Sequence, residues 1–207
     1  MKRRTTILIS CLLGALLVPA AACGPSSEEK AVRAAFQNFL EGLDRADPNQ
    51  LWALADDETH VFFDELARET REGIADIDAH WPEAARPAAR RAIAGDFVGA
   101  NTTGATLFGH FLDPRRLQAP QDPSARNIVR VEMSGAKATL VLESGETLEL
   151  MSDAAGAWRT AIFLAPAKEL PWVGTLRENL ATVHANATIL GGADNDAAHK
   201  KEGANTP

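Results

Sequence analysis

Tyrosine is missing from this 207-residue chain, cysteine occurs only twice, and basic residues are fewer than acidic ones. With a formal net charge of −7 the surface repels phosphate backbones, so we expect no nucleic-acid partner. Many polar small-molecule sites use a tyrosine hydroxyl, so its absence argues against an elaborate polar pocket. No motif indicates a cofactor or a metal. The 45% of apolar residues suits a single domain with its own core.

Long hydrophobic runs are also missing, except near the N-terminus. Residues 2–4 are basic, residues 7–18 are almost wholly apolar, and three alanines at 20–22 lead into Cys23. This order of basic, apolar and small residues predicts a signal peptide over residues 1–22. A retained membrane helix is the alternative, although residues 7–22 fall short of the roughly 18–20 apolar residues that a spanning helix needs.

The cysteine at the cleavage junction makes the segment resemble a bacterial lipoprotein signal. That resemblance implies acyl chains on Cys23, although Ala20 stands where the pattern usually has leucine; cleavage after Ala22 with a free thiol is the alternative. Cys11 would leave with the signal, so the mature domain would hold no disulfide. Gly24 replaces the aspartate that retains lipoproteins at the inner membrane. We therefore expect a bacterial envelope protein that is lipid-anchored and faces the periplasm, with the outer membrane favoured over the inner membrane.

Residues 28–112 are predicted to be largely helical. A short tether at residues 23–27 leads into a capping box formed by Ser26 and Glu29, which starts the first helix. Four extended residues reach only about 13 Å, so the domain should sit close to the membrane. Four further helices are expected. One starts at Asp47, one spans residues 59–80, a shorter one ends at about residue 94, and one spans residues 106–112.

The segment 128–163 predicts a β-meander. Glycine-bearing turns at residues 134–135, 144–145 and 155–156 divide it into four runs in which apolar and polar residues alternate. Val129, Val131 and Met133 share one face of the first run, and the fourth run extends over residues 158–162. Alternation of this kind is typical of an antiparallel sheet with one apolar face, which the neighbouring helices must cover.

After the meander, an amphipathic helix is expected over residues 172–190, ended by Gly191-Gly192. Residues 191–207 carry no apolar period and are predicted to be a disordered tail. The expected fold class is therefore α+β: a curved antiparallel meander of about four strands packed against N-terminal helices, with an extra C-terminal helix. One domain should span residues 28–190.

This order of elements resembles the nuclear-transport-factor-2-like superfamily, in particular its bacterial envelope lipoproteins. The residues that carry the resemblance are Phe36-Gln-Asn-Phe39-Leu40, Asp47 leading to Leu51-Trp52-Ala-Leu54, and the meander that ends in Gly156-Ala-Trp158-Arg159. The resemblance implies a cone of helices around a curved sheet that can hold a ligand. Two departures are a long helical insertion at about residues 59–112 and the helix after residue 163, which could plug or cover the cone.

Few residues suggest chemistry. His110 with Asp113, or Asp96, would be an acid–base pair of the kind that enzymes of this superfamily place in the cone. Trp52 and Trp158 are candidates for lining an apolar pocket, although packing in the core is the simpler interpretation. His60 and Asp64, four residues apart, are consistent with a metal pair, but a solvated acidic helix start explains them as well.

These observations favour a non-catalytic binding or accessory module for a hydrophobic small molecule or an envelope partner protein. The alternative is a small-molecule enzyme of the isomerase or hydro-lyase type that uses an acid–base pair in the cone. The resemblance to a superfamily does not decide between these two functions, because one fold hosts many functions.

Overall fold

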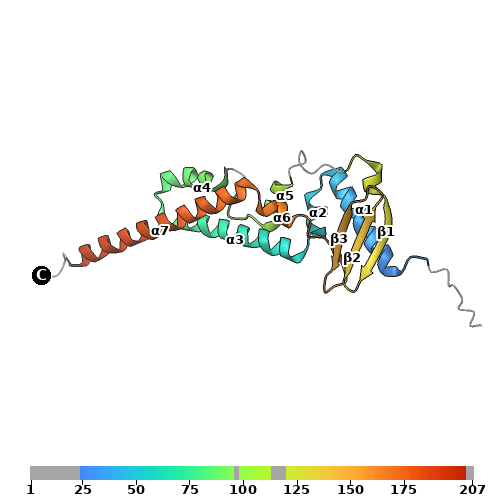
Figure 1. Ribbon diagram of the computed structural model, residues 1–207. Coiled ribbons are helices and arrows are strands. Elements are labelled where there is room, and N and C mark those ends of the chain that lie inside the picture. The colour runs from blue at the N-terminus through green and yellow to red at the C-terminus, as the bar shows by residue number, and fades with distance from the viewer. Residues whose placement is uncertain (1–23, 96–97, 113–119, 204–207) are drawn as a thin grey trace, which may run out of the picture.

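The chain folds into an elongated α+β structure, and its computed structural model describes residues 24–95, 98–112 and 120–203. One end is a four-stranded antiparallel sheet with its covering helix, and the other is a group of long helices (Figure 1). We refer to α1 (Ser27–Arg45) and strands β1–β4 as the sheet lobe. Helices α3 (Asp57–His80), α4 (Arg86–Ala94) and α7 (Pro171–Gly203) form the helical arm. The α+β class is thus confirmed.

The sheet is a simple meander with strand order β1-β2-β3-β4, as its alternating sequence predicts. Its strands are β1 (Ile128–Ser134), β2 (Lys137–Leu142), β3 (Thr147–Ser152) and β4 (Trp158–Arg159). Ala138, Leu140 and Leu150 are buried on one face, and the pairs Leu140↔Leu148 and Ala138↔Leu150 fix the register. The other face carries polar side chains and is solvent-exposed.

Helix α1 covers the apolar face of the sheet and begins where the capping box predicts. The Ser26 side chain accepts a hydrogen bond from the Glu29 backbone N–H at 3.0 Å. Buried α1 residues follow at helical spacing: Val32, Ala35, Phe36, Phe39, Leu40 and Leu43. The helix contacts β1 and β4 at the two edges of the sheet, so its side chains fill the space above it.

Two strand predictions are wrong in detail. The register of β1 shifts between Ile128 and Arg130, so Val129 leaves the apolar face and is 64% exposed. A bulge of this kind places two residues opposite one and reverses the side-chain alternation. The fourth strand has only two residues, because Thr160 turns away to pair with Ala55 in an isolated parallel bridge.

A short helix α6 (Leu164–Lys168) follows that turn, and α7 starts at Pro171. Pro166 lies in the first turn of α6 and Pro171 at the start of α7. Backbone N–H groups there have no acceptor within the helix, so a proline costs no hydrogen bond. The two prolines therefore lie at the starts of helices.

Helix α7 is longer than the sequence predicted. It continues through Gly191-Gly192 to Gly203, so the expected disordered tail is wrong for residues 191–203. Neither glycine adopts a positive φ, so neither caps the helix. Each costs only about 1 kcal/mol inside a helix, and alanines follow them. Gly191 also lies against α3: a Cβ there would be 3.2 Å from the His80 ring.

The helical arm is built on α3, whose predicted extent of residues 59–80 is confirmed to within two residues. Phe63, Leu66, Ile74 and Ile77 lie on its buried face, which packs against α7 and against the short helix α5 (Gly104–Phe111). Gly73 lies at the α3–α7 contact, where an added Cβ would be 2.6 Å from a Leu180 methyl. Among the described helices, none is both long and apolar enough to cross a membrane.

The glycine at the start of α5 allows α5 to approach α3 closely. A Cβ at residue 104 would lie 2.9 Å from the backbone nitrogen of Asp64, which cannot move without distorting α3. The Gly104→Ala variant should therefore lose about 1–3 kcal/mol of unfolding free energy, which is the usual cost of overpacking. Denaturant unfolding followed by circular dichroism measures the change.

Gly99→Ala is the matched control, because nothing lies within 4 Å of a Cβ at that position. It should unfold within about 0.5 kcal/mol of the unmodified protein. Equal stability of the two variants would contradict the close α3–α5 contact.

Candidate functional site

The sheet lobe and the helical arm meet at a joint formed by residues 53–56 and 153–160. Helix α2 (Pro48–Leu54) ends there, and α3 begins after two intervening residues. The Thr160 backbone N–H donates to the Leu54 carbonyl at 2.8 Å, and the Asp56 N–H donates to the Thr160 carbonyl at 3.1 Å. These two hydrogen bonds join the last strand of the sheet to the start of the arm.

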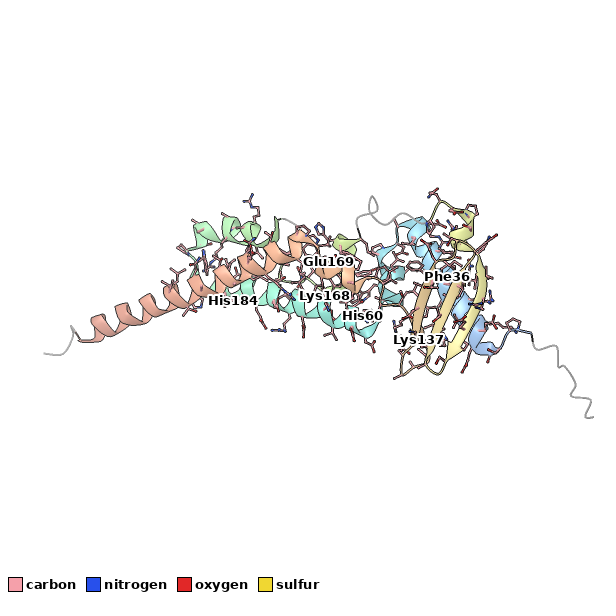
Figure 2. The ribbon with its side chains drawn as sticks, in the orientation of Figure 1. Phe36, His60, Lys137, Lys168, Glu169 and His184 are labelled. Atoms are coloured by element: carbon pink, nitrogen blue, oxygen red, sulfur yellow. The ribbon has the colours of Figure 1, made fainter. Side chains whose placement is uncertain are left out.

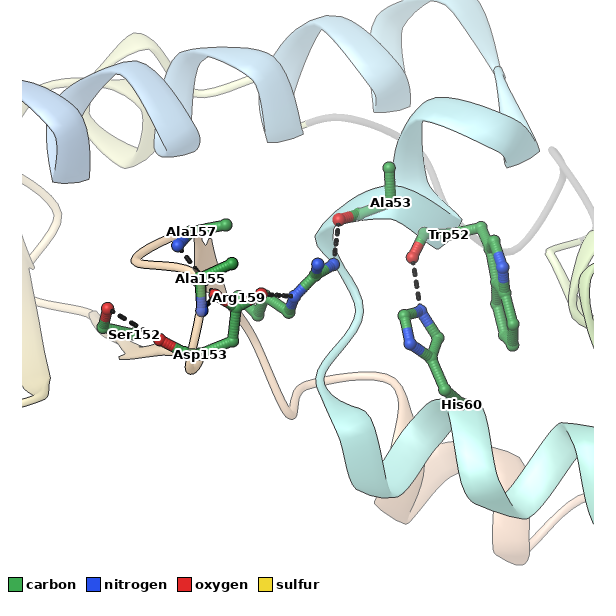
Figure 3. Close-up of polar contacts among 8 residues, drawn as sticks. All are labelled: Trp52, Ala53, His60, Ser152, Asp153, Ala155, Ala157 and Arg159. Atoms are coloured by element: carbon green, nitrogen blue, oxygen red, sulfur yellow. Dashed lines mark hydrogen bonds and ion pairs between the residues drawn. The ribbon is translucent and has the colours of Figure 1, made fainter.

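An ion pair reinforces the joint (Figure 3). Arg159 donates through Nε to Asp153 at 2.7 Å and through Nη1 to the Ala53 carbonyl at 2.6 Å. The Asp153 carboxylate also accepts the backbone N–H groups of Ala155 and Ala157 at 2.9 and 2.8 Å, which shapes the β3–β4 turn. The hydrogen bond from Arg159, followed by that from Ala157, lowers the pKa of Asp153 below its ordinary value.

A continuous row of phenylalanine rings passes through the joint inside the protein. Phe36 and Phe39 of α1 are 6.4 Å apart between ring centroids, and Phe39 lies 6.1 Å from Phe163. Phe163 contacts Phe108 of α5 at 5.2 Å, and Phe108 contacts Phe63 of α3 at 5.4 Å. The core is therefore shared by the sheet lobe and the helical arm.

The structure places the predicted pocket tryptophans in this packing. Trp52 is half-buried, with its ring centroid 5.1 Å from that of Phe108 and 4.2 Å from that of His60. His60 Nε2 donates to the Trp52 carbonyl at 2.8 Å, which holds the end of α2 on α3 (Figure 3). Trp158 is 8% exposed and faces the sheet core.

Of the catalytic candidates, only His110 lies in the described part of the chain. His110 is exposed on α5, which contacts α2 and α3, and its ring meets the edge of Trp172 at 5.7 Å. Asp96 and Asp113 lie outside the described residues, as does the lipidation candidate Cys23. Among the described residues, no group of three or more His, Cys, Asp or Glu side chains could hold a metal ion, and His60 and Asp64 therefore belong to none.

The sequence did not predict the pocket that lies between α3, α6 and α7. It has a volume of about 630 Å³ and is lined by Asp57, Glu58, Val61, Phe62, Glu65, Leu164, Lys168 and Arg177. Val61 is 55% exposed. It lies one position beside the buried row of Phe62, Leu66 and Thr70, at the edge of that face. Only the packing of α6 and α7 on α3 creates the pocket.

A second, smaller pocket of about 190 Å³ lies between α4 and α7. The Asn179 amide donates at 2.9 Å to the carbonyls of Ala92 and Ile93, near the end of α4, and so fixes one wall. No strand residue lines either of these two pockets.

The Asp153–Arg159 pair predicts a pH dependence of stability. A carboxyl whose folded pKa is lowered contributes stability above its unfolded pKa of about 3.9, and this is lost as the pH falls through the lower folded value. Asp153→Asn should lower the melting temperature at pH 7, and the deficit should shrink below pH 4. Thermal melts at several pH values measure it.

Glu169→Gln, which removes an exposed carboxylate on the far side of α6, is the control and should behave as the unmodified protein at every pH. A deficit of the Asp153→Asn variant that stays constant down to pH 2 would show that the charge of Asp153 contributes nothing.

Comparison of the chain with protein-family models, with curated proteins and with solved structures finds no match in any of the three.

Proposed function

We propose that this protein is a lipid-anchored, non-catalytic accessory module of the bacterial cell envelope that binds a partner protein through its helical arm. The observation that carries the proposal is a structural difference between the two ends of the molecule. The side chains of α1 fill the apolar face of the sheet, whereas α7 runs on beyond the C-terminal end of α3 (Figure 1).

The positions of the two ends support this arrangement. The N-terminal end of α1 lies at the sheet end of the molecule, and the C-terminal end of α7 lies at the opposite end (Figure 1). An anchor at Cys23 would hold the sheet lobe at the membrane, because α1 begins only four residues later. The helical arm would then extend into the periplasm, where it is accessible to another envelope protein.

The exposed side of α7 offers a contact surface away from the sheet. Ile189 is 69% exposed near the point where α7 leaves α3, and His184 pairs with Asp76 of α3 at 2.5 Å one turn earlier (Figure 2). Contact with a partner would remove this exposed isoleucine from water, which favours association. We favour a partner protein over a hydrophobic small molecule in a cone, because α1 occupies the sheet face.

The relationship to the nuclear-transport-factor-2-like superfamily stays part of the proposal. It is supported by the antiparallel meander crossed by an N-terminal helix, followed by a short second helix that starts at Asp47-Pro48. The enzyme alternative has less support: His110, its central residue, lies on the surface of α5 and not over the sheet.

Site-specific photocrosslinking in intact cells tests the proposal. A photoreactive residue at Thr188 or Ala75, both exposed on the arm, should give one discrete crosslinked envelope protein. The same probe at Glu149, on the outer face of the sheet, is the control and should not give that product. In the Cys23→Ser variant the protein should leave the membrane fraction and lose the crosslink.

Two results would contradict the proposal. An unmodified Cys23 at the mature N-terminus, seen by mass spectrometry, would exclude the acyl anchor. A product common to the arm and the sheet positions, or no discrete product from the arm, would exclude the arm as the binding surface.

A further inference from the structure

The pocket between α3, α6 and α7 has an apolar floor that is open to solvent. Phe62 and Leu164 form the buried part, with 7% and 9% of their surface exposed, and Val61 adds a half-exposed apolar side chain. The volume of about 630 Å³ lies within the range of small-molecule sites, roughly 300–1,000 Å³. The pocket can therefore accept an apolar group of several carbon atoms.

The wall formed by α3 is acidic. Asp57, Glu58 and Glu65 line it, and Glu58 and Glu65 are seven residues apart, so they lie on the same side of the helix. None of these three carboxylates has a hydrogen bond or a close ion pair to another described residue, although Glu65 interacts electrostatically with Arg68 one turn later on α3. Their negative charge is available to a positively charged group in the pocket.

The opposite wall, formed by α6 and α7, is basic. Lys168 lies on the short helix that leads into α7 (Figure 2) and has no ion pair with the α3 carboxylates. The Arg177 guanidinium stacks over the Phe62 ring at 5.5 Å and lies 3.8 Å from Glu69. That contact with Glu69 is long and leaves donors of the guanidinium for a ligand.

We propose that this pocket binds a small zwitterion with an apolar body, namely an apolar amino acid or a short apolar peptide with free termini. Its ammonium group would meet Glu58 and Glu65, its carboxylate would meet Lys168 and Arg177, and its side chains would cover Val61, Phe62 and Leu164. A purely anionic ligand would face three carboxylates, and a purely cationic one would face two basic groups. Only a ligand with both charges matches both walls.

This inference does not rest on the proposed partner protein, because the pocket lies beside the joint and not at the free end of the arm. The charged walls are solvent-exposed, so each end of the ligand should contribute only about fivefold to affinity. Affinities in the millimolar range are therefore expected.

The test uses the full chain purified in detergent and the dipeptide Leu-Leu, with ligand-observed NMR titration as the readout. Leu-Leu should bind saturably. N-acetyl-Leu-Leu, which lacks the ammonium group, and Leu-Leu amide, which lacks the carboxylate, should each bind about fivefold more weakly.

Variants assign each end of the ligand to its wall. In the Glu58→Gln/Glu65→Gln double variant the preference for a free ammonium group should vanish, while the preference for a free carboxylate remains. The Lys168→Gln/Arg177→Gln double variant should reverse that pattern. Glu178→Gln on α7 and Lys30→Gln on α1, both exposed and outside the pocket, should leave all three affinities unchanged.

Circular dichroism melts of every variant show whether it remains folded. All the changed side chains are exposed, so the replacements should leave the core packing unchanged. The absence of saturable Leu-Leu binding overturns the inference. Equal affinity of Leu-Leu and either blocked form, or preferences that persist in the pocket variants, overturns it as well.

Discussion

The arrangement of the whole molecule depends on the two backbone hydrogen bonds between Thr160 and residues 54 and 56. They make the last strand of the sheet continuous with the start of α3, although more than a hundred residues separate them in the chain. Thr160 is 1% exposed, so water cannot reach its backbone groups while the joint is closed, and each of these two hydrogen bonds should contribute about 0.5–1.5 kcal/mol. Arg159 adds a second link by bonding Asp153 of the hairpin and the Ala53 carbonyl. The orientation of the helical arm relative to the sheet lobe follows from this joint.

The aromatic core beneath the joint explains why the two ends behave as one domain. Rings from α1, α5 and α3 follow one another through Phe163, so apolar burial does not stop where the sheet ends. Phenylalanine needs no hydrogen-bond partner, which suits a row of rings that lies wholly inside the protein. The side chains of α1 cover the apolar face of the sheet, whereas the charged pocket beside α6 and the free end of α7 lie along the arm and are open to solvent. Both functional proposals therefore concern the arm.

Much of the fold could be predicted from the sequence, because local residue patterns determine where many of its helices and strands form. The capping box at Ser26, the period of α3 and the alternation in β2 and β3 depend on neighbours along the chain, and all three are confirmed. The errors arise where a distant contact overrides the pattern. Thr160 pairs with Ala55, which shortens β4, and Gly191 packs on His80 inside a helix that it was expected to end. The pocket could not be predicted, since its two walls are about a hundred residues apart and its residues carry no motif.

Hydrogen exchange at the Thr160 and Asp56 amides tests the joint most directly, because these are the donors of its two hydrogen bonds. If the joint links the sheet lobe to the helical arm in one cooperative unit, both amides should exchange within about tenfold of the Leu140 amide in the centre of the sheet. Exchange of Thr160 and Asp56 as fast as the exposed turn at Gly135, while Leu140 stays protected, would show that the sheet lobe and the arm open independently and would contradict this account.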